Sequence, residues 1–267
     1  MSAPTNAPMS APLILITGAS SGIGQALAAR YAQAGWRLAL VARRAEPMQA
    51  WAAAQGLTPD RAGIYAADVA DVDAFIAAAQ ACLQAQGLPQ VVVANAGISV
   101  GMDSAEREDL EVMRETLAIN NLGLAATFHP FLHPMRERGS GTLVGVASVA
   151  AIRGLPGHGA YCASKAAVVA YCESLRGECR RQGIRVVTLV PGYIATPLTA
   201  KNPYPMPFLM PAAEFARQAF TAIEAGDSYR VIPWQMGVVA KLLRLLPNAL
   251  FDRVMDGRGR KPRRSRA

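Results

Sequence analysis

The stretch 13–24 reads LILITGASSGIG and decides the fold class. Its first residues are apolar or β-branched, which is typical of a buried strand, and the glycine-rich turn after them opens an amphipathic helix expected over about 22–34. Gly18 permits the tight turn, Gly22 lets the backbone approach a phosphate, and Gly24 lets the helix pack on the strand. The amide groups at the start of such a helix favour a pyrophosphate. An ordinary strand–helix turn in a flavodoxin-like protein is the alternative.

Outward from this motif, short β-branched runs alternate with longer Ala-rich amphipathic stretches. Continuous apolar strands covered by helices indicate a parallel sheet that is buried on both faces. We therefore predict a doubly wound α/β fold, with a seven-stranded, mainly parallel sheet and right-handed crossovers. The expected strands are 13–17, 37–41, 62–66, 90–94, 142–147, 185–190 and 229–232. The expected helices are about 22–34, 45–54, 71–86, 104–137, 160–182 and 211–225.

The chain is expected to form a single domain over 13–256, because no linker, repeat or low-complexity block interrupts it. This domain includes an apolar helix over 234–251, which Pro247 should break or kink at about Leu246. Its wide apolar face must be covered, by its own domain, by a second copy or by a membrane surface. Residues 257–267 are expected to form a disordered basic tail.

Composition restricts the class of protein. Hydrophobic residues make up 52% of the 267 residues and charged residues 17%, which excludes a disordered chain. The net charge of +8 is unevenly placed, because six basic residues lie in 257–267 and the remainder holds 21 basic against 19 acidic residues. We therefore expect no nucleic-acid partner.

The termini and the cysteines bear on location and metal binding. Residues 1–12 are expected to form a flexible leader, since Pro4, Pro8 and Pro12 obstruct regular structure. No apolar run is long enough for a signal peptide or a membrane span. The four cysteines have no zinc spacing, and His129 and His133 have no third partner nearby in sequence. We predict a cytoplasmic protein without a metal site.

The residues after the second and third strands suggest which dinucleotide binds. The second strand ends in Arg43 and Arg44, with no acidic residue until Glu46. An acid there would bind the ribose 2′-hydroxyl of NAD, whereas arginine suits the 2′-phosphate of NADP. NADP(H) is therefore the expected cofactor and NAD(H) the less favoured one, unless both arginines merely begin a solvated helix. Asp68 would accept from the adenine amino group, or would cap the next helix.

A candidate catalytic group follows the fifth strand. Tyr161 and Lys165 are four residues apart, which places them on one face of a helix. An ammonium one turn away stabilises a phenolate and lowers the pKa of the tyrosine, so the pair could exchange a proton with a carbonyl or alcohol. Ser148, at the end of the fifth strand, would hold the substrate oxygen or would cap the strand end. A chance YxxxK pattern in an Ala-rich helix is the alternative for the pair.

Six ordered motifs resemble the short-chain dehydrogenase/reductase (SDR) family, in its compact single-domain branch. The resemblance runs from about 13 to 233 and implies a Rossmann fold, a nicotinamide cofactor and reversible hydride transfer between a carbonyl and an alcohol. Two departures are Ala94, where the family often has asparagine, and an extra Pro130 in the helix that usually joins a dimer. The motifs are TGASSGIG (17–24), ANAG (94–97), NNLG (120–123), Ser148, YCASK (161–165) and PGYIAT (191–196).

The resemblance also implies roles for individual residues. Tyr161 would be the general acid or base, Lys165 would lower its pKa and bind the nicotinamide ribose, and Ser148 would orient the substrate oxygen. Asn120, which has the Asn-x-x-Gly spacing, would hold a water in a proton relay, and Asn95 would brace the sheet. The implied cofactor-binding residues are Gly18, Ser20, Ser21, Gly22, Ile23, Gly24, Arg43, Arg44, Asp68, Val69, Asn95, Gly97, Tyr161, Lys165, Pro191, Gly192, Ile194 and Thr196.

The substrate should lie over Tyr161, between the loops 150–158 and 197–211. The second loop carries one charge, Lys201, and an apolar loop suits an apolar ligand, although it could instead pack a dimer surface. The leading hypothesis is an NADP-dependent reductase of apolar ketones or dehydrogenase of secondary alcohols, working as a homodimer or homotetramer. A 3-oxoacyl-carrier reductase and a catalytically idle nucleotide-binding scaffold are the alternatives. Weak peripheral membrane contact through 234–267 is the remaining hypothesis on partners.

Overall fold

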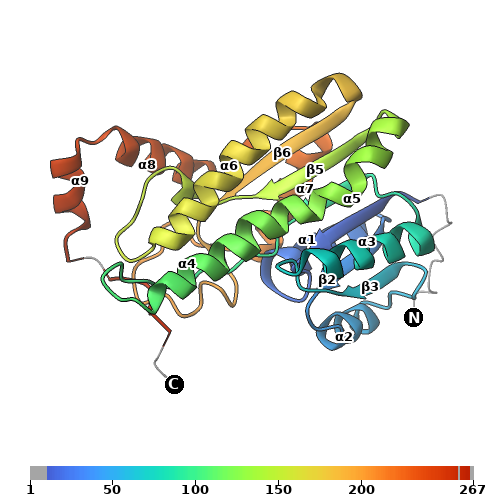
Figure 1. The fold of residues 1–267 in the computed structure, drawn as a ribbon, viewed down its shortest axis with the longest axis horizontal. Coiled ribbons are helices and arrows are strands. Elements are labelled where there is room, and N and C mark those ends of the chain that lie inside the picture. The colour runs from blue at the N-terminus through green and yellow to red at the C-terminus, as the bar shows by residue number, and fades with distance from the viewer. Residues whose placement is uncertain (1–10, 258, 265–267) are drawn as a thin grey trace.

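The fold is a single seven-stranded sheet in which every pair of neighbouring strands is parallel (Figure 1). It was obtained as a computed structural model, which describes residues 11–257 and 259–264, so most of the expected leader lies outside the described residues. The predicted doubly wound α/β fold is confirmed. The strands of the sheet are β1 (Leu13–Thr17), β2 (Arg37–Ala42), β3 (Ala62–Ala66), β4 (Val91–Ala94), β5 (Gly141–Val146), β6 (Ile184–Pro191) and β9 (Tyr229–Ile232).

The strand order is β3-β2-β1-β4-β5-β6-β9, so the chain reverses its direction of winding between β1 and β4. Ile16 of β1 pairs in register with Leu40 on one side and with Val93 on the other. In a sheet of this kind, ligands bind beyond the carboxyl ends of the strands at the point of reversal. The glycine-rich turn after β1 lies at this point.

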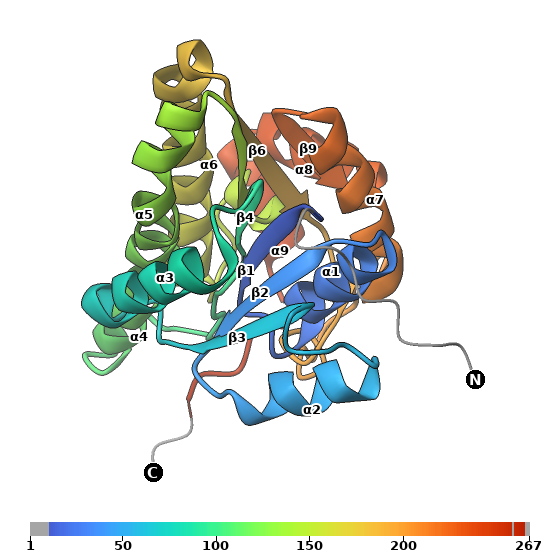
Figure 2. The same ribbon diagram turned by 90° about the vertical axis from the view of Figure 1, so that its right-hand side faces the viewer.

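Helices cover both faces of the sheet (Figure 2). The long helices are α1 (Gly22–Gln33), α2 (Glu46–Ala54), α3 (Val72–Gln86), α4 (Asp109–Leu117), α5 (Gly123–Arg138), α6 (Gly159–Cys179) and α7 (Ala212–Ala225). Helices α3, α5 and α6 pack on one face, where Phe75, Phe128 and Val168 are buried. Helices α1, α2 and α7 pack on the other face, where Tyr31 and Phe215 are buried. The strand side chains that alternate between these two cores are almost all apolar, as the sequence predicts.

The helix expected over 104–137 differs most from the prediction. Residues 104–108 form turns, and α4 starts only at Asp109. A π-helical turn, Ala118–Leu122, then separates α4 from α5, and π-helical turns often mark functional sites. Pro130 lies inside α5, which continues through it to Arg138. Other short elements are two 3₁₀ turns, Val149–Ala151 and Arg180–Gln182, and a small sheet of β7 (Ile194–Ala195) and β8 (Met210–Pro211).

The C-terminal region begins with two helices, α8 (Trp234–Leu245) and α9 (Asn248–Met255). The break between them falls at Leu246 before Pro247, where it was predicted. Of the basic tail over 257–267 that was expected to be disordered, residues 258 and 265–267 lie outside the described residues. The described residues 259–264 lie along the loop after β4 and along α4, where they contact Gly101, Asp109 and Glu115. We call residues 259–264 the C-terminal strap. None of the helices in the described ranges is long and apolar enough to cross a membrane.

Candidate functional site

The glycine-rich turn brings backbone very close to backbone. Gly18 and Gly22 have φ angles of 65° and 58°, which favour glycine, and a Cβ atom on Gly18 would lie 2.9 Å from Cα of Ala96. A Cβ atom on Gly24 would overlap the carbonyl oxygen of Gly18. Asn95 fixes the turn against β4, because its Nδ2 donates to the carbonyl oxygen of Thr17 at 3.0 Å.

Beyond the carboxyl ends of the strands lies a cavity of about 470 Å³, which we call the cofactor cavity. It contains nearly all of the residues that sequence reasoning assigned to cofactor binding. The exception is Gly24, which lies behind the turn and packs α1 on the sheet. The predicted residues that line the cavity are Gly18, Ser20, Ser21, Gly22, Ile23, Arg43, Arg44, Asp68, Val69, Asn95, Gly97, Tyr161, Lys165, Pro191, Gly192, Ile194 and Thr196.

The shape and chemistry of this cavity fit a nicotinamide dinucleotide. The turn at Gly18 and Gly22 leaves room for a pyrophosphate over the start of α1, and a Cβ on Gly22 would press on Thr196 at 3.3 Å. Arg43 and Arg44 are exposed at one end of the cavity. Asp68 is the one acidic residue among the described residues that line it, and its Oδ1 accepts from the amide of Ala70 at 3.0 Å.

Lys165 lies at the other end of the cavity and is buried. Its Nζ donates to the carbonyl oxygen of Val146 at 2.8 Å and lies 5.8 Å from the centre of the Tyr161 ring. Burial lowers the pKa of Lys165 from 10.5 to about 8, because removal from water disfavours the ammonium. The strand β5 therefore supplies both the carbonyl that holds this lysine and, two residues later, Ser148.

Tyr161 lies between Lys165 and Ser148. Burial raises the pKa of Tyr161, and its hydrogen bond with Ser148 partly offsets that rise. That Lys165 lowers this pKa stays a prediction, since the effects that the structure shows are the loss of hydration and the hydrogen bond with Ser148. Ser148 also accepts a hydrogen bond from the amide of Ala150 at 3.2 Å, so it caps the 3₁₀ turn Val149–Ala151 that follows it.

Asn120 does not line the cofactor cavity but supports it from behind. Its amide group exchanges hydrogen bonds with the backbone of Ile98, at 2.8 and 3.0 Å, and donates to Oγ of Ser164 at 2.9 Å. A Cβ on Gly97 would lie 3.1 Å from Oδ1 of Asn120 and 3.5 Å from Nζ of Lys165. Asn120, in the π-helical turn, thus ties the loop after β4 to α6 directly beside Lys165.

A second cavity, of about 800 Å³, adjoins the first, and we call it the substrate cavity. The two spaces share a boundary to which Ser148 and Tyr161 belong. The residues that line both cavities are Ser148, Tyr161, Gly192, Leu198 and Thr199. The loops 150–158 and 197–211 contribute walls, as predicted. Leu198, Tyr204 and Met206 line the cavity, and Nε2 of His158 lies 3.1 Å from the hydroxyl of Tyr204. Phe208 and Leu209, in contrast, are exposed.

Sequence reasoning missed several walls of the substrate cavity. The helix α8 contributes Met236, Val239 and Leu243, and the C-terminal strap contributes Lys261. The sequence did carry a signal for α8, because its apolar face is wider than packing against one surface requires and so indicates a second contact. Nothing in the sequence of the tail indicates that Lys261 reaches the cavity. Among the described residues no cluster of His, Cys, Asp or Glu could hold a metal ion.

Comparison with known proteins places this geometry in context. The sequence model of the short chain dehydrogenase family matches residues 12–205. An uncharacterized oxidoreductase of Myxococcus xanthus is 41% identical over 249 residues, which cover 92% of this chain and 97% of that protein.

Two solved structures are similar in fold and carry a dinucleotide. An alcohol dehydrogenase from the archaeon Thermococcus sibiricus, complexed with 5-hydroxy-NADP, has a TM-score of 0.74 and 26% identity, covering 84% of this chain and 96% of its own. A 3-ketoacyl-(acyl-carrier-protein) reductase from Brucella melitensis, complexed with NADH, has a TM-score of 0.76 and 28% identity, covering 84% and 98%.

Proposed function

We propose a specific reaction for this chain, which belongs to the short-chain dehydrogenase family. It is an oxidoreductase that acts on CH–OH or carbonyl groups with a nicotinamide cofactor. The reaction that the site supports best is the NADP(H)-dependent interconversion of an apolar ketone and its secondary alcohol. The observation that carries this proposal is the meeting of the two cavities at Ser148 and Tyr161.

Within this proposal, the cofactor's nicotinamide ring supplies the hydride for reduction of the carbonyl carbon, or accepts it in the reverse reaction. The Tyr161 hydroxyl donates the proton that the carbonyl oxygen takes up, and Ser148 donates a hydrogen bond to the same oxygen. Lys165 holds a positive charge beside the phenolate that results. Asn120 is a positioning residue, because its contacts run to Ile98 and Ser164.

The preference for NADP(H) rests on Arg43 and Arg44 at the end of β2. Both arginines line the cofactor cavity, and no acidic residue of β2 would repel a 2′-phosphate there. Guanidinium groups bind phosphate in a bidentate manner, which an isolated ribose hydroxyl does not need. The two similar structures hold different dinucleotides, one an NADP derivative and the other NADH, so family membership alone leaves this choice open.

A turnover assay tests the proposal. Purified protein with NADPH and a panel of apolar ketones should consume NADPH with each accepted ketone, measured by the loss of cofactor absorbance. Turnover restricted to 3-oxoacyl thioesters would favour the acyl-carrier reductase instead, and the Brucella melitensis structure is the observation in favour of that alternative. NADPH binding without turnover of any carbonyl or alcohol would favour the idle scaffold.

The remaining proposals concern assembly and location. We propose a single folding unit over 13–256, since the sheet takes strands from both ends of this range. We further propose a cytoplasmic homodimer or homotetramer without nucleic-acid partners. The exposed apolar face of α8 supports self-association, with weak membrane contact as the alternative.

A further inference from the structure

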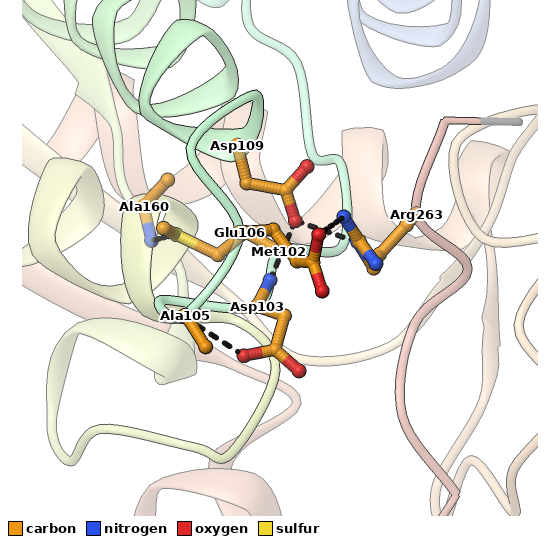
Figure 3. Close-up of polar contacts among 7 residues, drawn as sticks. All are labelled: Met102, Asp103, Ala105, Glu106, Asp109, Ala160 and Arg263. Carbon is orange, nitrogen blue, oxygen red and sulfur yellow. Dashed lines mark hydrogen bonds and ion pairs between the residues drawn. The ribbon is translucent and has the colours of Figure 1, made fainter. Parts of the chain in front are cut away.

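The C-terminal strap is attached to the rest of the molecule at several points, one of which is Arg263 beside Glu106 and Asp109 (Figure 3). Arg263 Nε donates to Oδ2 of Asp109 at 2.6 Å, and its guanidinium also lies 3.7 Å from Glu106. The carbonyl oxygen of Pro262 accepts from the amide of Gly101 at 3.1 Å, and Arg264 pairs with Glu115. These contacts hold both the backbone and the side chains of the strap against α4 and the loop before it.

Lys261, directly before these attachments in the chain, is directed toward the substrate cavity. Its Nζ donates to Oγ of Ser99 at 3.0 Å and to the carbonyl oxygen of Leu198 at 3.3 Å. Ser99, Leu198 and Lys261 all line the substrate cavity. The ammonium group is thus fixed at the cavity wall by two neutral oxygens, with further hydrogen-bonding capacity left.

The charges around this ammonium do not balance. Lys261 and Arg153 both line the substrate cavity. No acidic residue is among the described residues that line it. Arg153 is already engaged: it donates to the carbonyl oxygen of Leu246 at 2.7 Å and lies 3.8 Å from the centre of the Phe251 ring. Burial lowers the pKa of the neighbouring His158, and the positive charge of Lys261 acts in the same direction.

The walls of the substrate cavity are largely apolar. Leu155, Met236, Val239 and Leu243 are among them. A ligand that fills this space and reaches both Tyr161 and Lys261 therefore needs an apolar body, a carbonyl or hydroxyl group for Tyr161 and an anionic group for Lys261. The single positive charge of this ammonium matches the single negative charge of a carboxylate, whereas a phosphate monoester carries about two negative charges.

We propose that Lys261 determines substrate specificity by binding a carboxylate, so that the substrates are apolar oxo acids and the corresponding hydroxy acids. The carbonyl at Tyr161 in this assignment rests on the function proposed above, whereas the carboxylate site rests on the strap and the substrate cavity.

The first experiment measures turnover. Straight-chain oxo acids with a methyl ketone at one end, in a series of chain lengths, are compared with their methyl esters in the presence of NADPH. At the best chain length, kcat/KM for the acid should exceed that for the ester by about ten- to a hundredfold, the usual range for a hydrogen bond to a charged group. This ratio should fall to near unity in Lys261→Gln and be largely restored in Lys261→Arg.

Lys201→Gln is the matched control, because it removes the same charge from an exposed lysine that does not line the cavity. It should keep the wild-type ratio. Equal turnover of acid and ester by the wild type, or an unchanged ratio in Lys261→Gln, would overturn the proposal while leaving the reductase function intact.

The second experiment does not depend on catalysis. Decanoate and 1-decanol, neither of which carries a ketone, are compared by thermal shift on the wild type, Lys261→Gln and Lys201→Gln. Decanoate should raise Tm more than decanol does in the wild type and in Lys201→Gln but not in Lys261→Gln. A decanoate effect that survives in Lys261→Gln would overturn the carboxylate site. If the Tm shifts follow this pattern but no ketone is turned over in the first experiment, the result would support the carboxylate site and contradict the reductase function.

Discussion

Tyr161 lines both cavities, so removal of its hydroxyl should separate binding from chemistry. We expect Tyr161→Phe to bind NADPH like the wild type and to lose about 10²- to 10⁴-fold in kcat, the usual contribution of a general acid. Fluorescence titration gives the first quantity and steady-state kinetics the second. Tyr171→Phe, on the exposed side of the same helix, is the control. Wild-type turnover by Tyr161→Phe would refute the assigned role.

Cofactor preference can be tested at Ala42 and Arg43. The double variant Ala42→Asp/Arg43→Ala removes a phosphate partner and adds a repulsive carboxylate, so the ratio of Kd values for NADPH and NADH should shift toward NADH by about tenfold or more. Titration of both cofactors measures it. Arg107→Ala removes one exposed positive charge elsewhere and should leave the ratio unchanged. A wild type that binds NADH as tightly as NADPH would contradict the interpretation of β2.

The buried Lys165 should lower the free energy of unfolding, although turnover needs this residue. Its pKa of about 8 against 10.5 means that the folded protein at pH 7 bears the cost of a buried charge. We expect Lys165→Met to raise the free energy of unfolding by about 1–2 kcal/mol at pH 7, after the loss of the hydrogen bond to Val146, and to abolish turnover. Chemical denaturation measures the first effect, with Lys201→Met as an exposed control.

The pH dependence of this effect has a definite sign. Above about pH 8 the folded protein releases the Lys165 proton, whereas the unfolded chain keeps it up to about pH 10.5. The wild type therefore gains stability from this group as pH rises through that window, and the advantage of Lys165→Met should shrink between pH 7 and pH 9.5. A variant less stable than the wild type at pH 7 would show that the lysine is not a net cost.

At the scale of the element, the strap can be released without touching the cavity. Arg263→Ala removes the contact with Asp109, so we expect faster amide hydrogen exchange in 259–264 and a several-fold rise in KM for ketones that fill the substrate cavity. Arg114→Ala removes the same charge from α4, where the arginine pairs with Glu111, and should change neither quantity. Unchanged exchange in Arg263→Ala would mean that other contacts hold the strap.

The elements differ in how far the sequence predicts them. Strands β1 to β6 and β9 were predictable because buried parallel strands are continuous apolar runs between turn residues. The start of α4 was not, since 104–108 are polar residues that suit a turn as well as a helix. The strap was unpredictable for a different reason: its order depends on Asp109, Glu106 and Glu115, which are more than 140 residues away along the chain.

The same division applies to the site. Residues that line the cofactor cavity follow strand ends in a local, repeatable pattern, so Gly18, Arg43 and Ser148 could be placed from sequence alone. The substrate walls come from α8 and the strap, whose positions depend on packing between distant segments. The rise in the pKa of Tyr161 was also missed, because spacing shows the nearby ammonium but not the loss of water.

At the scale of the whole molecule, α8 leaves an apolar stripe uncovered. Trp234, Leu242 and Leu245 are 69%, 60% and 79% exposed and lie on one side of the helix. An apolar stripe of this kind marks an interaction site. We expect Leu242→Gln/Leu245→Gln to shift the protein from an oligomer to a monomer, measured by size exclusion with light scattering. Lys241→Gln, on the same helix, is the control.

Membrane contact is the competing explanation for this stripe. If the stripe is a protein interface, the wild type should not float with anionic liposomes at low or at high salt. Flotation at low salt that is lost in Leu242→Gln/Leu245→Gln would show that the stripe meets lipid instead.

The residues that line the two cavities lie in different parts of the sequence, and this has a consequence for how the protein can evolve by recombination. Arg43, Arg44 and Val69 of the cofactor cavity come early in the chain, whereas most residues that line the substrate cavity follow Gly192. A single genetic crossover between β5 and β6 would therefore exchange α8, the substrate loop and the strap together while leaving Arg43 and Arg44 in place. Under the function proposed above, recombination among relatives would give descendants that act on new compounds yet draw on the same pool of reducing equivalents.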